Sequence, residues 1–140
     1  MGIRRWFRLP TTALAAGVLV TGSMFVGTQA ANAASSPIEA CGGGSYHEID
    51  HHDFGTTATI HLLYNGSTDC VVTWNNHPTG AKMWLAAAVQ RQDTGDGPYD
   101  ADYYAYYAGP VKITAPGICI RWSGAAGEDT VWNSNWSHCG

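Results

Sequence analysis

Basic residues are scarce in this 140-residue chain, which has seven lysines and arginines against eleven aspartates and glutamates. Three of the seven, Arg4, Arg5 and Arg8, fall among the first eight residues, so the chain beyond residue 33 keeps four basic and eleven acidic residues, a formal net charge of −7. A net negative charge repels the phosphate backbone of nucleic acids, and the sequence has no basic patch to offset this repulsion. The composition therefore argues against a nucleic-acid partner.

Helical periodicity is also missing beyond residue 33. No stretch keeps apolar residues at i, i+3, i+4 and i+7 for three turns, whereas β-branched and aromatic runs broken by Gly, Pro and Asn recur about every ten residues. This pattern predicts an all-β fold, a small sandwich or barrel of about seven strands.

Strong turn signals separate the expected strands. Residues 56–64 and 70–74 flank Asn65-Gly66 and should pair as a hairpin. Residues 81–92 should form a long strand with Met83, Leu85, Ala87 and Val89 on one face, although their alanine run leaves a short helix as the rival. The remaining expected elements are an acidic loop, an aromatic strand, a second hairpin around Pro116-Gly117 and a last short strand, at 93–102, 103–107, 111–122 and 130–132.

The N-terminus has the features of an export signal. After its three arginines comes an apolar run from about residue 9 to 30, which ends in Ala31-Asn32-Ala33. We expect a signal peptide at 1–33 and a single secreted β domain at 34–140, with no membrane span after processing. Pro10 and the small residues after the run disfavour an anchor, and the Arg4-Arg5 pair leaves the twin-arginine route open beside the general secretory route.

The chain has four cysteines, Cys41, Cys70, Cys119 and Cys139, and none has C-x-x-C spacing. This spacing disfavours a metal site or a reactive thiol, and in an exported chain an even count predicts disulfides with three possible connectivities. We favour Cys41 with Cys70 and Cys119 with Cys139, because each pair closes a loop of roughly 20–30 residues and fastens one terminus to a strand.

Several short segments resemble, in order, spacing and cysteine position, those of a known family. They are 41–46 (CGGGSY), 62–65 (LLYN), 70–73 (CVVT), 107–111 (YAGPV), 117–124 (GICIRWSG) and Cys139. On these residues the chain resembles the spore-associated protein A family, small secreted actinobacterial proteins. The resemblance implies a protein found with spores or the outer surface of filamentous bacteria, with no assigned activity, cofactor or catalytic residue. The stretch from His47 to Asp53 departs from the family pattern.

That stretch contains the zinc-protease motif H-E-x-x-H, spelled by His47-Glu48-Ile49-Asp50-His51. On a helix this spacing puts both imidazoles on one face, and the Glu activates a metal-bound water. Glycines at 42–44 and 55 leave only about ten residues for such a helix, and the extended signature fails because Phe54 stands where it needs Gly. For these reasons a small secreted zinc metalloprotease that uses this motif is kept only as the alternative function.

A weaker form of the same hypothesis is metal capture without catalysis. His47, His51, His52 and Asp53 are ligand-type side chains close together in sequence. The competing interpretation is a solvated polar loop or strand edge, and our prediction is that the protein has no metal and no cofactor.

The acidic loop at 93–102 offers two further patterns. Asp93-Thr94-Gly95 matches the aspartic-protease tripeptide, but that mechanism needs two such loops and the chain has one. Asp96, Asp100 and Asp102 could hold a surface calcium, although the EF-hand order is absent. A solvated loop is the better interpretation.

Aromatic side chains are abundant, with five Trp and seven Tyr beyond residue 33. Some must fill the core and staple hairpins, but this number exceeds what so small an interior needs. Exposed rings beside Asn and Asp can hold sugars by stacking and hydrogen bonding. The candidate ligand-binding aromatics are Tyr103, Tyr104, Tyr106, Tyr107, Trp132 and Trp136.

The sequence thus predicts a non-catalytic exported protein of the extracellular space or of the spore or cell surface. Adhesion or coat interaction is the expected role, and the expected partner is a cell-wall or spore-surface component, a glycan or a coat protein. Self-association through aromatic strand edges is a third interpretation.

Overall fold

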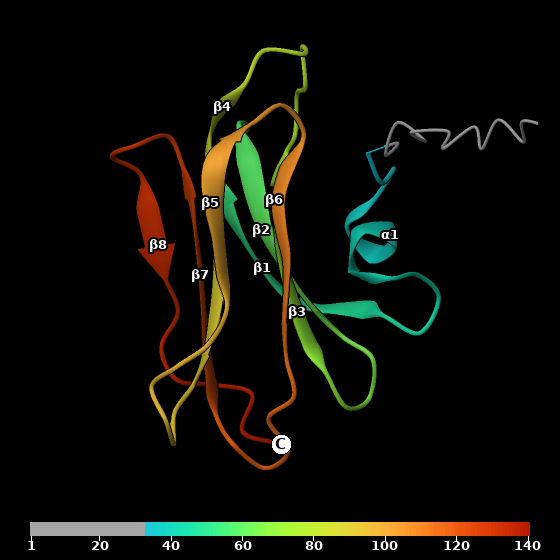
Figure 1. Ribbon diagram of the computed structural model, residues 1–140, viewed down its shortest axis with the longest axis vertical. Coiled ribbons are helices and arrows are strands. Elements are labelled where there is room, and N and C mark those ends of the chain that lie inside the picture. Colours follow the sequence, from blue (N-terminus) through green and yellow to red (C-terminus); the bar gives the residue numbers. More distant parts are fainter. Residues whose placement is uncertain (1–32) are drawn as a thin grey trace, which may run out of the picture. The chain divides into compact units, whose positions relative to one another are not determined.

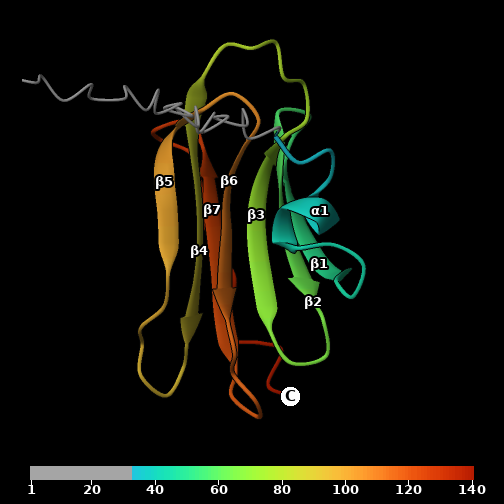
Figure 2. The same ribbon diagram turned by 45° about the vertical axis from the view of Figure 1, so that its right-hand side comes forward.

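Two four-stranded antiparallel sheets pack face to face in the computed structural model, which describes residues 33–140 (Figures 1 and 2). Sheet A has the strand order β1-β2-β3-β6 and sheet B the order β5-β4-β7-β8. The elements are α1 (Pro37–Cys41), β1 (His47–Phe54), β2 (Ala58–Tyr64), β3 (Asp69–Asn75), β4 (Met83–Arg91), β5 (Tyr99–Tyr104), β6 (Tyr107–Ile113), β7 (Ile120–Ala126) and β8 (Val131–Asn133). The all-β prediction is confirmed, and the predicted signal peptide lies outside the described residues except for Ala33.

Two of the predicted local structures are confirmed. The β2–β3 hairpin turns at Asn65-Gly66, where the Asn65 side-chain oxygen accepts hydrogen bonds from the backbone N–H groups of Ser67 and Thr68, and where Gly66 takes a φ of +98°. The alanine-rich segment is strand β4 and not a helix, with Leu85, Ala87 and Val89 buried as predicted. The alternation of buried and half-exposed residues favours a strand here and outweighs the helix propensity of alanine.

Three other predictions are wrong. The aromatic strand expected at 103–107 is divided, because β5 ends at Tyr104 and β6 begins at Tyr107 after a turn. Residues 99–102, expected in a loop, begin strand β5, because Tyr99, Ala101 and Tyr103 line one face of the sheet with the period of a strand. The segments around Pro116-Gly117 are not a hairpin, since β6 pairs with β3 in sheet A and β7 pairs with β4 in sheet B. The chain crosses there from one sheet to the other.

The short helix α1 was not anticipated from the sequence. Ser36 caps its N-terminus by accepting a hydrogen bond from the Glu39 N–H, Pro37 opens it, and Gly42 ends it in the left-handed conformation at φ +118°. The helix lies against the outer face of sheet A (Figure 2), where Cys41, Cys70 and neighbouring apolar residues form a small second core. Five residues are too few to show a helical period, so local caps and packing define this element.

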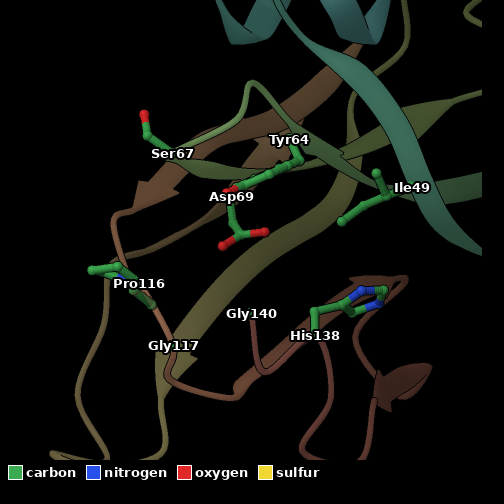
Figure 3. Close-up of a pocket in the computed structure, with 9 residues that line it drawn as sticks. Ile49, Tyr64, Ser67, Asp69, Pro116, Gly117, His138 and Gly140 are labelled. Carbon is green, nitrogen blue, oxygen red and sulfur yellow. The ribbon is translucent and has the colours of Figure 1, made fainter.

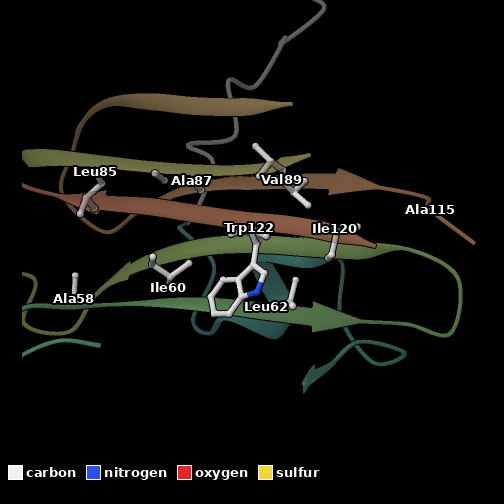
Figure 4. Packing of buried hydrophobic residues seen from close by; sticks show 12 residues of the cluster. Ala58, Ile60, Leu62, Leu85, Ala87, Val89, Ala115, Ile120 and Trp122 are labelled. Carbon is white, nitrogen blue, oxygen red and sulfur yellow. The ribbon is translucent and has the colours of Figure 1, made fainter. Parts of the chain in front are cut away.

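The main core lies between the sheets and is built from the inward-facing residues of both (Figure 4). Trp122 of β7 is its largest buried side chain, and Ile60, Leu62 and Leu85 are also fully buried. A hydrogen bond of 2.6 Å from the Thr73 hydroxyl to the Ala86 carbonyl links the two sheets within this core. Burial of this apolar surface is the main stabilising contribution.

Disulfides Cys41–Cys70 and Cys119–Cys139 fasten the two ends of the described chain. The first bond ties α1 to β3, and the second ties the C-terminal tail to the segment just before β7. This is the connectivity favoured from the sequence. Within residues 33–140 no helix is both long and apolar enough to span a membrane.

Candidate functional site

The outer face of sheet B has a floor of small side chains. Strand register places the residues that alternate with the core on this face. They are Ala86, Ala88, Ala101, Ser123 and Ala125. The centre of the sheet is therefore lined by short side chains, of which Ala125 is covered by its neighbours (2% exposed) and the others are partly exposed.

Large side chains stand around this floor. Tyr99 is 78% exposed, Tyr103 47% and Val131 63%, and these are three of the five exposed large hydrophobic residues of the described chain. Trp84 packs edge-on against Tyr103 at a ring distance of 5.4 Å, and the Arg121 guanidinium lies 4.5 Å from the centre of the Trp136 ring. We call the floor together with Trp84, Tyr99, Tyr103, Val131 and Trp136 the sheet B face.

The six aromatics predicted as ligand-binding do not form one surface. Tyr103 and Trp136 belong to the sheet B face, and Tyr106 is exposed in the turn between β5 and β6. Tyr107 instead stacks on Trp74 on sheet A, with ring centroids 5.1 Å apart.

The other two predicted aromatics close the edges of the sandwich. Trp132 lies between the sheets where β1 faces β8, stacked on His52 at 4.1 Å and edge-on to Trp122 at 4.8 Å. Tyr104 donates a hydrogen bond of 2.5 Å to Asp100, which also accepts one from the Gly109 N–H. Both rings are half-buried and act in packing.

Tyr99 was missed from the sequence because it falls in the segment expected to be a loop. Tyr99, Ala101 and Tyr103 recur at every second residue, and this strand pattern could have placed Tyr99 on the same face as Tyr103.

The H-E-x-x-H motif lies in strand β1, so the helix that a zinc protease requires is absent there. His47 pairs with Tyr64 and His51 pairs with His61, and these partners stand on opposite faces of β2. The two imidazoles therefore point to opposite sides of the sheet. The geometry of the alternative function is not present at this motif.

The outward side chains of β1 form a row of hydrogen bonds and ion pairs with β2. Glu48 bridges His51, at 3.1 Å, and His61, while Asp53 accepts a hydrogen bond from Thr59. His52 points the other way, into the Trp132 stack. Across residues 33–140, no group of three or more His, Cys, Asp or Glu side chains is placed to hold a metal ion.

The acidic segment is likewise held by internal contacts. Asp100 is engaged by Tyr104 and Gly109, and Asp93 forms an ion pair of 2.7 Å with Arg91. Because that side-chain hydrogen bond favours the charged carboxylate, the pKa of Asp93 is lowered.

A cavity of about 230 Å³ opens at the end of the sandwich (Figure 3). We call it the end cavity. It is lined by Ile49, Tyr64, Ser67, Asp69, Ala115, Pro116, Gly117, His138 and Gly140. These residues come from β1, the β2–β3 hairpin, the crossing between the sheets, and the C-terminal tail.

A carboxylate occupies an inward-facing position in this cavity. Asp69, Val71 and Thr73 alternate along β3 on the side that faces sheet B, and the latter two are fully buried core residues. Asp69 is only 6% exposed, and its carboxylate points into the space between Pro116, Gly117, Gly140 and His138 (Figure 3). Burial raises its pKa from 3.8 to about 6, an effect that the nearby His138 partly opposes.

His138 is held in place on the opposite side of the cavity. Its backbone has φ +50°, which few residues other than glycine adopt, and its Nε2 lies 3.2 Å from a carboxylate oxygen of Asp50. Asp50 follows Ile49, the extra residue of a β-bulge in β1. Bulges often redirect side chains next to binding sites, as this one does for Ile49 and Asp50. None of these residues was singled out from the sequence as part of a cavity.

Comparison with curated proteins found a named relative. The chain is 38% identical over 130 residues to "Spore-associated protein A" of Streptomyces coelicolor, an alignment that covers 91% of this chain and 82% of the relative. No family model matches the chain, and no solved structure matches it. Together with the two disulfides, the relative's name indicates an extracellular or surface location. On this identity and coverage, the chain belongs to the spore-associated protein A family.

Proposed function

We propose that this protein attaches to the spore or cell surface through the sheet B face, and that its partner there is a wall polysaccharide. The observation that carries the proposal is the exposure of Tyr99, Tyr103 and Val131 around a floor of small residues. Exposed aromatic rings on a flat sheet surface can stack on the faces of sugar rings. The spore-associated relative supports the location.

The spacing of the rings favours a polysaccharide over a coat protein. Tyr99 and Tyr103 are four residues apart on one strand, a separation of roughly 13 Å. Separate rings at this distance can each stack on a different sugar of one chain, whereas a protein partner would be expected to meet a continuous apolar core.

Polar groups on the same face complete the arrangement. Register places Gln90, Ser123 and Asn133 on the outer side of sheet B, where amide and hydroxyl groups can bond sugar hydroxyls. Together with the rings and the Arg121 guanidinium beside Trp136, these groups can donate hydrogen bonds to the hydroxyls of a glycan and accept hydrogen bonds from them. Such binding needs no catalytic residue and no cofactor.

The test is co-sedimentation of purified protein with washed spores and with isolated wall polysaccharide. The double variant Tyr99→Ala/Tyr103→Ala should bind at least about tenfold more weakly, since each lost ring contact contributes about 1 kcal/mol. Tyr106→Ala is the matched control, because Tyr106 is also a 47% exposed tyrosine but lies outside the sheet B face. Equal losses in both variants, or none in the double variant, would refute the proposal.

Fractionation of a culture into medium, mycelium and spores tests the same proposal in the organism. The wild-type protein should be recovered with spores or wall and the double variant in the medium. Recovery of both in the medium would contradict attachment.

A further inference from the structure

The end cavity contains a carboxylate that the fold does not satisfy. Asp69 is only 6% exposed, and no residue of the described chain donates a hydrogen bond to its carboxylate, whose oxygens open onto the cavity. Its neighbours on the same face of β3, Val71 and Thr73, belong to the core. An apolar residue at position 69 would continue that pattern at lower cost.

Burying a charged group without a partner is expensive, and the raised pKa of Asp69 reflects that cost. His138 is the charged or titratable group of the tail that acts on Asp69, but its ring nitrogen is already engaged by Asp50. A group that destabilises the fold and faces an open cavity is a candidate for ligand binding. The missing partner must be a cation or a strong hydrogen-bond donor.

The cavity walls narrow the choice of cation. Ile49, Ala115 and Pro116 are apolar, and Tyr64 adds an aromatic ring. A calcium ion needs six to eight oxygen ligands, and Asp69 supplies the one side-chain carboxylate among the lining residues. An organic ammonium group fits better, because its hydrocarbon part can contact the apolar walls and the tyrosine ring while its charge meets the carboxylate.

The size of the cavity limits the ligand as well. A volume of about 230 Å³ is below the roughly 300–1,000 Å³ of pockets that hold drug-sized molecules. It matches a side chain or a single small ring. The walls are also fixed, since Ser137 and Ile120 exchange two backbone hydrogen bonds and Cys139 is bonded to Cys119.

We propose that the end cavity binds a primary ammonium group on a short alkyl or sugar frame, with Asp69 as its counter-ion. This site is separate from the sheet B face and does not depend on the polysaccharide proposal. The ammonium group could belong to a free amine, to an amino sugar or to a lysine side chain of another protein.

The test is an NMR titration of the protein at pH 7.5 with n-butylammonium, and with 1-butanol as the neutral probe of similar shape. The amine should shift the backbone signals of Asp69, Gly117, His138 and Gly140 and saturate with a dissociation constant on the order of 1 mM, as expected for a small fragment. Asp69→Asn should weaken binding at least about tenfold. Asp96→Asn, the same change at an exposed carboxylate outside the cavity, should leave it unchanged.

A second measurement keeps the test valid if Asp69→Asn does not fold. In the wild-type protein, bound n-butylammonium should lower the pH at which the Asp69 carboxyl carbon titrates, because a nearby positive charge favours the ionised form. Equal binding of 1-butanol, full binding by Asp69→Asn, or an unmoved Asp69 titration would overturn the proposal.

Two further pairs of probes identify the source of the ammonium group. Glucosamine is compared with N-acetylglucosamine, and Nα-acetyl-lysine methylamide with its Nζ-acetylated form. Shifts at the same residues with the free amine alone support an amino sugar in the first pair and a lysine in the second. Tyr99→Ala/Tyr103→Ala should bind n-butylammonium normally, so failure of the polysaccharide proposal would be recognised separately.

Discussion

Asp69 and His138 face one cavity from distant parts of the chain, and each directly precedes a disulfide cysteine, Cys70 and Cys139. Asp69 begins β3 at the end of the first hairpin, whereas His138 lies in the tail that returns to Ile120. The two titratable side chains of the end cavity are thus positioned by the sheet on one side and by a disulfide bond on the other. Four predictions about stability follow from this arrangement and from the packing around it.

The first prediction concerns the pH dependence of folding. The folded-state pKa of Asp69, about 6, exceeds its ordinary value of 3.8, so the folded protein holds this proton more tightly than the unfolded chain. The contribution of Asp69 to stability is therefore fully present below pH 3.8 and is lost as the pH rises through about 6. Asp69→Asn should remove this loss and gain about 2 kcal/mol in unfolding free energy at pH 7 relative to pH 4.

Urea unfolding of wild type and variant at the two pH values measures this difference. A variant whose stability relative to wild type is the same at pH 4 and pH 7 would show that Asp69 does not titrate as described.

The second prediction separates the two disulfides. Replacing either cysteine pair with serine should cost about 3 kcal/mol of stability, because the closed loops span 29 and 20 residues. Only Cys119→Ser/Cys139→Ser should also weaken n-butylammonium binding, since that bond fixes the tail that carries His138 and Gly140. Cys41→Ser/Cys70→Ser should loosen α1, which packs on the outer face of sheet A, and so should leave amine binding in the cavity unchanged. Equal effects of both pairs on amine binding would contradict this assignment of the cavity wall.

The third prediction distinguishes packing aromatics from exposed ones. Trp132→Ala should cost about 3 kcal/mol, because the ring fills the edge between the sheets against His52 and Trp122. Tyr103→Ala should cost less than about 1 kcal/mol, since that ring is about half exposed and lies outside the core. Thermal or urea unfolding of both variants measures their loss of unfolding free energy. A larger loss for Tyr103→Ala than for Trp132→Ala would refute this description of the sheet B face.

The fourth prediction tests the close approach of the sheets. A β-carbon on Gly124 would come within 2.5 Å of the Thr73 hydroxyl and 2.8 Å of the Ala86 carbonyl oxygen, the two atoms whose hydrogen bond joins the sheets. Gly124→Ala should therefore destabilise the protein by about 1–3 kcal/mol. Gly44→Ala is the control, because no atom lies within 4 Å of its added carbon. Similar unfolding free energies for the two variants would contradict the packing described.

Local patterns predicted much of the fold. Asn65-Gly66 predicted its hairpin because the turn geometry depends on those two residues. The alternation of apolar and other residues predicted β4, because this pattern also depends only on residues close together in the sequence. The crossing at Pro116-Gly117 was missed, because the same tight turn can join two strands of one sheet or carry the chain to the other. That choice depends on which strands are already paired.

The candidate sites show the same limit. Counting aromatic rings indicated surface recognition, but sequence distance could not separate Tyr103, which is exposed, from Tyr104, which faces inward. The end cavity was not predictable, because its lining residues come from four separate segments that only the folded sandwich brings together. Asp69 becomes unusual only once the register shows that it points inward.

The measurement that tests the central claim most directly is an NMR titration with soluble oligosaccharides from the spore wall. The proposed function predicts that the shifted signals belong to the sheet B face, with Tyr99, Tyr103, Ala101 and Ser123 among the largest changes. Shifts confined to sheet A and α1, or no shift anywhere at saturating oligosaccharide, would contradict attachment through this face.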